Sequence, residues 1–474
     1  MKETRAAIRL FTGILLSLVL LTGFVYVARV QANRVRWLNR AQNTRIQDAR
    51  KTTLQGTIFD SAFTVLAESP EPGVRRYIQD KSIRLALSHT LGDQKGMSET
   101  GVENRHATTL LGMTDLTGTD RTLQTLRGDA VAGCDIVLTL NAEMCAYMAS
   151  QFPSGSRGAC AVINYRTGAI LGKVSLPGYD PAAMDQGAQD TAYYDRVLQY
   201  RYAPGSTYKI VTLTAALKNL PGVESEMFDC QGVWSFADRV LQCAGGTAHG
   251  SLDLKGAFSQ SCNITFASLA YRMGAEAMKA ASEDFGVNVQ FAFDDIVLYE
   301  SHCLNSSLAA GEVIQAGFGQ GKTELTPLHM AMIAGAIANE GVMMEPKLIR
   351  EVRRHAGGTV SSMQPAQWRT VTDADTARTV ARYMYAAVHD RLSTGKNADI
   401  SGYTAGYVCG KTGSAEVSSD KTKATNAWYV GFLYGDEEHP YAIAVVVEGG
   451  GSGGQTAAPI ASRVLKKAIQ MDLY

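Results

Sequence analysis

The sequence predicts an α+β protein built on an antiparallel β-sheet that helices cover on both faces, preceded by a small pedestal domain and an N-terminal transmembrane helix. Two strand-like runs, Cys160–Tyr165 and Ala169–Leu176, flank the turn-forming Arg166-Thr167-Gly168 and predict a β-hairpin. Near the C-terminus three more strand-like runs follow, the last two joined by a charged turn: Tyr407–Val417, Ala427–Tyr434 and Tyr441–Glu448.

Helical patterns lie between and after these strands, which is why we expect helices to cover the sheet. The expected helices are Tyr208–Leu217, Leu254–Arg272 with an interruption at Ser261–Asn263, a helix that begins at Pro327, Asp373–Leu392 and residues 456–470. The helix at Pro327 is the best delimited, because Thr326 can serve as its N-cap and Gly341 stands just past its end.

The N-terminus predicts a membrane anchor. Basic residues precede Leu10–Ala28, an apolar run of nineteen residues without a charge, which is close to the length that spans a hydrocarbon core. They indicate that residues 1–9 stay in the cytoplasm and that the rest lies outside, as a single-pass protein of the cell membrane. A cleaved signal peptide is the alternative, with a candidate cleavage site at Val30-Gln31-Ala32.

Length and net charge limit the number of domains and the functions that the remainder of the chain can have. With 474 residues it is too long for one ordinary core. We assign residues 29–135 to a stalk and pedestal domain, and residues 136–474, which begin with the apolar strand Ile136–Leu140, to the main domain. Lys and Arg total 45, as do Asp and Glu, and this zero net charge argues against a general nucleic-acid-binding protein.

The most informative motif is S-x-x-K, formed by Ser206 and Lys209 behind Pro204. Residues three apart on a helix share one face, so Lys209 can lie against the Ser206 hydroxyl. A serine becomes a good nucleophile only when a base removes its proton, and a lysine can do so if burial lowers its pKa. A lone match of this kind is common by chance and would then indicate a surface serine and lysine.

Two further motifs follow in order. Ser261-Cys262-Asn263 reads S-x-N and Lys411-Thr412-Gly413 reads K-T-G. The three motifs together resemble those of penicillin-binding proteins and serine β-lactamases, and the chain most resembles the class B penicillin-binding proteins, which are peptidoglycan D,D-transpeptidases. The resemblance implies a penicillin-binding transpeptidase fold for residues 136–474 and a serine acyl-enzyme that needs no metal and no organic cofactor.

The resemblance also implies a catalytic role for each motif. Ser206 is the nucleophile and Lys209 is its base. Lys411 is a second cation that helps to keep Lys209 neutral. Ser261 relays a proton between the lysines and the leaving amine, and Asn263 holds a lysine or the substrate amide.

The same resemblance implies how substrate is held. Lys411 and the hydroxyls of Thr412 and Ser414 suit the terminal carboxylate of a D-Ala-D-Ala stem peptide. Gly413 lets the substrate backbone approach the strand because no Cβ intervenes, and the backbone N–H groups of Ser206 and Ser414 form the oxyanion hole. An amine of a neighbouring stem peptide resolves the acyl-enzyme, and β-lactams acylate the same serine.

Other functions remain open on these residues. A D,D-carboxypeptidase or a β-lactamase would pass the acyl group to water, and a membrane β-lactam receptor would be acylated without turnover. A non-catalytic scaffold is a further alternative, against which the intact motifs argue. Family members work beside a multi-pass lipid II polymerase, a SEDS-type glycosyltransferase, which implies contacts through the anchor and pedestal.

Several other polar residues are expected to be structural. Gln55 and Ser61 stand where the family often carries arginines, which weakens any salt-bridge role at that point. We expect His89 and His249 to be structural histidines and Glu416 to be a solvated strand charge.

The eight cysteines include no C-x-x-C pair and no histidine at metal-ligand spacing, so we expect no zinc site. An extracytoplasmic location permits disulfides, and Cys230 and Cys243, thirteen residues apart in a Gly-rich loop, are the best candidate pair. The alternative is that all thiols are free. Cys262 and Cys409 are expected to be buried and to act as small hydrophobic side chains.

Overall fold

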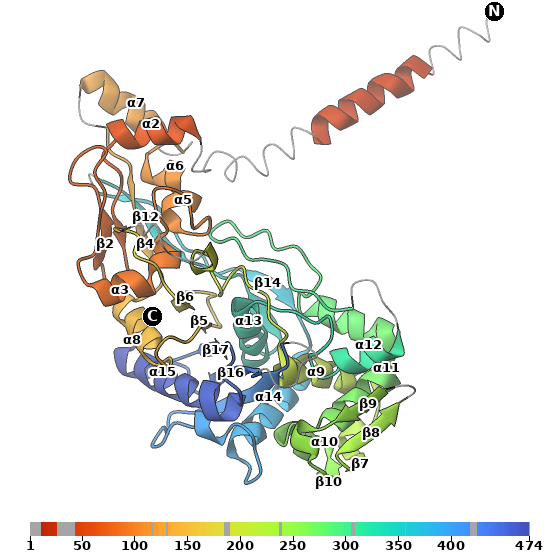
Figure 1. Ribbon diagram of the computed structural model, residues 1–474. Coiled ribbons are helices and arrows are strands. Elements are labelled where there is room, and N and C mark those ends of the chain that lie inside the picture. The colour runs from red at the N-terminus through yellow and green to blue at the C-terminus, as the bar shows by residue number, and fades with distance from the viewer. Residues whose placement is uncertain are drawn as a thin grey trace, which may run out of the picture.

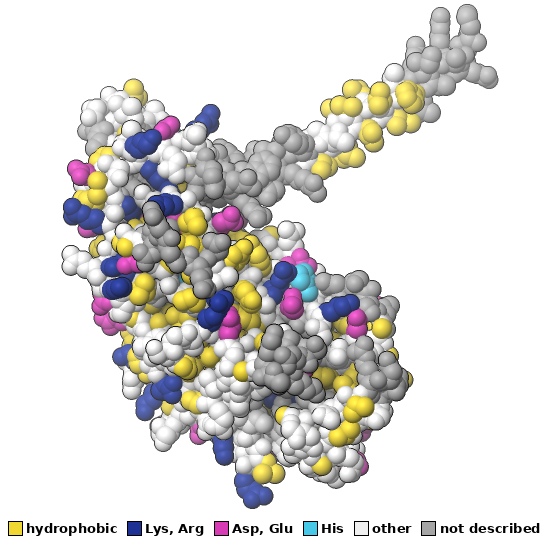
Figure 2. All heavy atoms as spheres, viewed as in Figure 1, with side chains coloured by type: hydrophobic (Ala, Val, Ile, Leu, Met, Phe, Trp, Pro, Cys, Tyr) yellow, Lys and Arg dark blue, Asp and Glu magenta, His cyan; other side chains and the backbone are white. Residues whose placement is uncertain are grey.

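The computed structural model describes residues 11–25, 43–114, 118–128, 131–183, 190–236, 239–304, 309–355, 357–417 and 424–473. Residues 11–25 form a helix whose surface is covered by hydrophobic side chains (Figure 2). Within the described part of the chain, no helix is both long and apolar enough to span a bilayer. The other residues of the expected anchor, Leu10 and 26–28, lie outside the described residues.

The core of the molecule is a five-stranded antiparallel sheet (Figure 1). Its strands, in spatial order, are β15 (Tyr407–Ala415), β16 (Asn426–Tyr434), β17 (Tyr441–Val447), β5 (Gly158–Asn164) and β6 (Ile170–Leu176). The predicted hairpin and the predicted C-terminal meander are both confirmed. In this register Lys411 on the edge strand β15 pairs with Val430, which pairs in turn with Ala444.

Helices cover both faces of this sheet, as predicted; three of them are α13 (Pro327–Ala338), α8 (Ala142–Ser150) and α15 (Ala458–Met471). On one face α13 lies so close that a Cβ added to Gly335 would be 3.5 Å from Ile163. On the other face Met148 of α8 lies against Gly172, which pairs with Val162. Because Val162 and Ile163 are consecutive on one strand, their side chains point to opposite faces.

A group of helices packs beside the sheet and carries two of the three motifs: α9 (Lys209–Asn219), α10 (Leu254–Ser259), α11 (Asn263–Asp284), α12 (Ala310–Ala316) and α14 (Ala374–His389). α9 packs against α11 and α14, and α14 also packs on β15. The predicted interruption at Ser261–Asn263 is confirmed. α11 is broken by a kink at Gly274, close to the predicted end at Arg272, and helix continues beyond the kink to Asp284.

A six-stranded sheet adjoins the first at one end, where Lys347 forms a β-bridge with Ala169, the residue before β6. Its order is β13 (Thr359–Ser362), β12 (Ile349–Arg354), β4 (Cys134–Leu138), β1 (Ile58–Phe59), β2 (Val65–Glu68) and β3 (Arg76–Tyr77). The strand predicted to open the main domain is β4, and it pairs instead with β1 and β12 in this sheet. The sequence could not show this, because the partner strand β12 comes some two hundred residues later. The boundary predicted at residue 136 therefore falls inside a shared sheet, and the division into domains stays a prediction.

Short helices complete the N-terminal part: α2 (Thr44–Thr52), α3 (Lys81–Ala86), α4 (Ser88–Leu91), α5 (Val102–Arg105), α6 (Ala107–Leu110) and α7 (Gly118–Arg127). The buried carboxylate of Glu103 pairs with Arg75 at 2.6 Å and accepts a hydrogen bond from Gln55 at 2.7 Å. Gln55 thus donates to the carboxylate of the Glu103–Arg75 ion pair, in which Arg75 supplies the cation. His89 is buried and its Nε2 donates to the Ala192 carbonyl at 2.7 Å, which confirms its structural role.

Three small two-stranded sheets lie outside these layers. β7 (Met227–Cys230) pairs with β10 (Gly250–Asp253), β8 (Val233–Phe236) pairs with β9 (Arg239–Gln242), and β11 (Val342–Met344) pairs with β14 (Gln367–Thr370). The first two sheets form a lobe next to α10 and α11 (Figure 1).

Candidate active site

Ser206 lies in a single 3-10 turn, Gly205–Tyr208, and α9 begins directly after it at Lys209. The predicted helix therefore exists, but the serine belongs to the tighter turn in front of it. The turn is held from outside, since the Gly205 amide donates to the Gly319 carbonyl at 2.9 Å and the Trp428 indole donates to the Ala203 carbonyl at 3.1 Å. Ser206 itself is half-buried.

Lys209 points from α9 into the gap between α10 and α11. Its Nζ donates to the Ser261 carbonyl oxygen at 2.7 Å and to Oδ1 of Asn263 at 2.8 Å, and it lies 3.3 Å from the Ser261 hydroxyl. The side chain is fully buried. Burial disfavours the ammonium form and lowers the pKa of Lys209 to about 7.

Ser261 has a left-handed backbone conformation, with φ of 61°, which a residue other than glycine adopts only under outside constraint. This turn brings both its carbonyl and its hydroxyl to the lysines. Lys411 on β15 donates to the Ser261 hydroxyl at 2.9 Å and to the Thr412 carbonyl at 3.1 Å. The pKa of Lys411 falls well below its usual value, because burial and the neighbouring charge of Lys209 both disfavour its ammonium form.

The K-T-G strand also packs directly against the turn that carries the nucleophile. A Cβ on Gly413 would lie 2.8 Å from the Pro204 carbonyl oxygen, and one on Gly205 would lie 3.2 Å from the Ser414 carbonyl oxygen. Glycine is therefore required at both positions for this approach. The structure thus brings the S-x-x-K segment to the edge strand as closely as backbone can pack.

The hydroxyl groups of the K-T-G strand differ in their surroundings. Thr412 is almost fully buried, and its hydroxyl forms a 2.7 Å hydrogen bond with that of Thr394. Ser414 is exposed and accepts a hydrogen bond from the Gly453 amide at 3.2 Å. Thr394 was missed by sequence reasoning, and its loop carries no motif that could have pointed to it. Glu416 follows β15 and is exposed, as expected of a solvated charge.

Asp195, in the segment that leads to the nucleophile, forms a buried ion pair with Lys173 of β6. Asp195 also accepts from the Val197 amide at 2.9 Å, so the pair anchors the chain ahead of Ser206. Sequence analysis did not identify it, because the two residues pair only through the tertiary fold.

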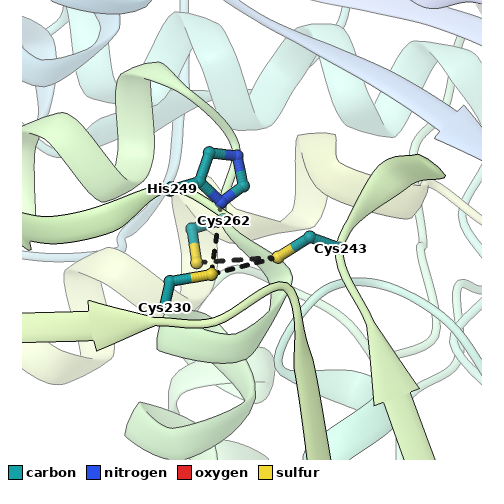
Figure 3. A group of neighbouring side chains, drawn as sticks. All are labelled: Cys230, Cys243, His249 and Cys262. Carbon is teal, nitrogen blue, oxygen red and sulfur yellow. Dashed lines mark hydrogen bonds between the residues drawn. The ribbon is translucent and has the colours of Figure 1, made fainter. Parts of the chain in front are cut away.

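The lobe beside α11 holds a cluster that the sequence analysis did not expect. Cys230, Cys243, His249 and Cys262 bring their sulfur atoms and one ring nitrogen within 4.8 Å of one another (Figure 3). The sequence analysis expected no zinc site because no histidine stands at metal-ligand spacing along the chain, but the tertiary fold brings His249 to the three cysteines. Cys230 and Cys243 are free thiols whose sulfurs are 3.6 Å apart, so the structure contains neighbours but not the predicted disulfide.

Comparison with known proteins agrees with this geometry. Residues 158–466 match the family model of the penicillin binding protein transpeptidase domain. The peptidoglycan D,D-transpeptidase PbpA of Mycolicibacterium smegmatis is 29% identical over 338 residues, which cover 66% of this chain and 67% of that protein. MrdA, the peptidoglycan D,D-transpeptidase of Haemophilus influenzae, is 26% identical over 436 residues, which cover 82% of this chain and 64% of that protein.

Solved structures give the same answer for the fold. Penicillin-binding protein A from M. tuberculosis, in its ceftriaxone acyl-enzyme complex, superposes with a TM-score of 0.80 at 24% identity over 90% of this chain and 100% of that one. The D,D-transpeptidase domain of a peptidoglycan glycosyltransferase from Eggerthella lenta has a TM-score of 0.75 at 29% identity, over 89% and 99% of the two chains. Since the family match spans more than half of the chain and contains all three motifs, this chain belongs to the penicillin-binding protein transpeptidase family.

Proposed function

We propose that this chain is a peptidoglycan D,D-transpeptidase, which cross-links stem peptides in bacterial cell-wall synthesis through an acyl-enzyme on Ser206. The observation that carries the proposal is the environment of the Ser261 hydroxyl. Lys411 of the third motif donates to this oxygen at 2.9 Å, and Nζ of Lys209 from the first motif lies 3.3 Å from it, so both lysines meet at one atom of the second motif. A surface serine and lysine that matched S-x-x-K by chance would have no such partners.

The first step is activation of the nucleophile. A neutral lysine amine has two N–H donors and one lone pair, and the Ser261 carbonyl and Asn263 Oδ1 are obligate acceptors for those donors. The lone pair of Lys209 is then left to accept the Ser206 proton while Oγ attacks the penultimate D-Ala carbonyl. The backbone N–H groups of Ser206 and Ser414 stabilise the oxyanion.

The proton must next reach the leaving amine. Ser261 Oγ lies between the two lysines and can accept from one while it donates to the substrate nitrogen. As the C–N bond breaks, terminal D-Ala leaves with that proton, and Lys411 with the hydroxyls of Thr412 and Ser414 holds its carboxylate. An amine of a second stem peptide then attacks the ester, its proton follows the reverse path, and Ser206 Oγ is released.

β-Lactams acylate the same serine, since their strained amide presents a carbonyl and a carboxylate to the same groups. The deep burial of Lys209 supports this assignment, because burial disfavours its ammonium form and leaves an amine that can act as the base.

The proposal includes a place in the cell. Residues 1–9 lie in the cytoplasm, residues 10–28 anchor the chain in the membrane, and the remainder is extracytoplasmic. The hydrophobic surface of residues 11–25 (Figure 2) and the basic residues before it support this placement. Residues 29–135 serve as stalk and pedestal, through which the chain contacts a multi-pass lipid II polymerase of the SEDS type.

The test is mass spectrometry of the full chain after reaction with penicillin G. We expect one adduct, on the peptide that contains Ser206, and none in Ser206→Ala. Ser225→Ala changes an exposed serine outside the three motifs, so it is the matched control and should retain the adduct. An adduct in Ser206→Ala, or on another residue of the wild-type chain, would contradict the proposal.

A second assay separates transpeptidation from its hydrolytic alternatives. A donor stem peptide that ends in D-Ala-D-Ala is supplied with and without an acceptor amine. We expect a cross-linked product that depends on Ser206. Release of D-Ala to water alone would instead assign a carboxypeptidase, and acylation by penicillin with no turnover of the peptide would assign a receptor.

A further inference from the structure

The strongest feature that the proposed function does not use is the cluster of Cys230, Cys243, His249 and Cys262. The four residues come from separate segments: the end of β7, the residue after β9, the residue before β10 and the N-cap of α11 (Figure 3). All three sulfurs are buried, whereas His249 is half-buried at the surface of the lobe. A closed group of three thiols and one imidazole is a ligand set typical of structural zinc.

The distances fit a single tetrahedral ion. With Zn–S bonds of about 2.3 Å and a Zn–N bond of about 2.0 Å, a tetrahedron places two sulfurs about 3.8 Å apart and a sulfur and a nitrogen about 3.5 Å apart. The sulfur of Cys243 lies 3.6 Å from that of Cys230 and 3.8 Å from that of Cys262. Cys230 Sγ lies 3.3 Å from Nδ1 of His249.

The sulfur of Cys262, the N-cap residue of α11, is surrounded by hydrogen-bond donors. Cys262 Sγ accepts from the amide of Thr265 at 3.4 Å and from its hydroxyl at 3.2 Å. These donors belong to the first turn of α11, where negative charge is stabilised. Donors to ligating atoms are the usual outer support of a metal site.

The cluster is joined to the active site through the S-x-N motif. Cys262 stands between Ser261 and Asn263, the two residues that accept from Lys209. Asn263 also donates to the Gln242 carbonyl at 3.1 Å, next to Cys243. A bond from a metal to Cys262 would therefore fix the one residue that separates the two acceptors of Lys209.

We propose that Cys230, Cys243, His249 and Cys262 bind one Zn²⁺ and that this ion positions the S-x-N segment for acylation. Binding replaces each S–H bond by a Zn–S bond and releases the thiol protons to solvent. With four protein ligands no position is left for water or substrate, so the metal acts by holding the loop and not as a Lewis acid. The ligands are positioning residues, and the part of the proposal that concerns acylation rests on the proposed function.

Metal binding is tested directly on the full chain, purified in detergent with reductant and loaded with Zn²⁺. Elemental analysis should give about one zinc per chain, and replacement by Co²⁺ should give the intense visible bands of a tetrahedral thiolate site. Cys243→Ser and His249→Gln should each retain less than about a tenth of the metal after dialysis against a chelator. Cys303→Ser, which changes a buried thiol bonded to Thr323 outside the cluster, is the matched control and should keep it.

Two results would overturn the metal site. One is wild-type protein that holds no zinc after loading. The other is a Cys230–Cys243 disulfide in wild-type protein isolated without oxidant, because it would remove two ligands. His249→Gln is the variant least expected to disturb folding, because the side chain of His249 is only half-buried. Full zinc retention in this variant would exclude His249 as a ligand.

Positioning is tested by removing the ion and measuring acylation by a fluorescent penicillin. Chelated protein should react at least about tenfold more slowly, and added Zn²⁺ should restore the rate. An unchanged rate after verified zinc loss would overturn the positioning role. Ser206→Ala should bind zinc normally but should not be labelled by the penicillin. If wild-type protein binds zinc but is never acylated, the proposed function is contradicted while the metal site remains supported.

Discussion

Replacing Asn263 by aspartate would put a carboxylate where an amide oxygen now lies 2.8 Å from Lys209 Nζ. Burial lowers the pKa of this lysine to about 7. A carboxylate at such a distance stabilises the ammonium form and raises a lysine pKa by about 1 to 3 units. The neutral form of Lys209 would then appear only at higher pH than in the wild-type chain.

The size of the effect follows from the neutral fraction, since only neutral Lys209 can accept the Ser206 proton. At pH 7 about half of the lysine is neutral when its pKa is about 7, about 9% when it is about 8 and about 0.1% when it is about 10. Asn263→Asp should therefore slow acylation at neutral pH by about 5-fold to 500-fold. The rate should recover as the pH is raised through the new pKa.

The assay is the second-order rate constant for acylation by a fluorescent penicillin, measured from about pH 6 to about pH 10. The wild-type rate should rise with pH and level off above a midpoint near the lysine pKa, and the midpoint of Asn263→Asp should lie higher. Asn263→Ala loses the same hydrogen bonds without adding charge, so its midpoint should not move upward. A rate for Asn263→Asp that is lower by the same factor at every pH would refute the reasoning.

Three further substitutions test the frame around the site. Gly413→Ala should slow acylation by up to about 100-fold, because its Cβ would lie 2.8 Å from a carbonyl oxygen of the nucleophile segment, and an unchanged rate would contradict that close approach. Asp195→Asn should lower the free energy of unfolding by about 3–5 kcal/mol in a denaturant titration, since it leaves Lys173 buried without its partner; a change below about 1 kcal/mol would show that the pair is not buried as described. Trp428→Phe should lose about 1 kcal/mol with its hydrogen bond to Ala203, and equal stability to wild type would argue that water replaces that bond.

The local part of the site could be predicted from sequence because helical spacing is a property of the backbone. Ser206 and Lys209 are three residues apart, and the interruption at Ser261 was visible as a break in a helical pattern. The strands of the main sheet were predicted to within a few residues, because alternating and β-branched runs bounded by turns are a short-range signal. That helices cover the sheet followed from their positions between and after the strands in the sequence.

Long-range pairing could not be predicted in this way. That β4 joins β1 and β12, and not the main sheet, depends on a strand two hundred residues further on. The same holds for Thr394 beside Thr412, and for the ion pair of Lys173 and Asp195. In each case the partner is chosen by the path of the chain, which no local pattern encodes.

The cysteines show most clearly which features the sequence determines and which depend on the tertiary structure. The sequence by itself determined the three motifs, their order, the residue types that acyl transfer requires and the segments that become helix and strand. Only the tertiary structure decided that Lys209 and Lys411 share the Ser261 hydroxyl, and that Cys262 meets Cys230, Cys243 and His249. The physical reason is that motif spacing reports the contacts of one helix or strand, whereas these contacts exist only after two sheets and a lobe have packed together.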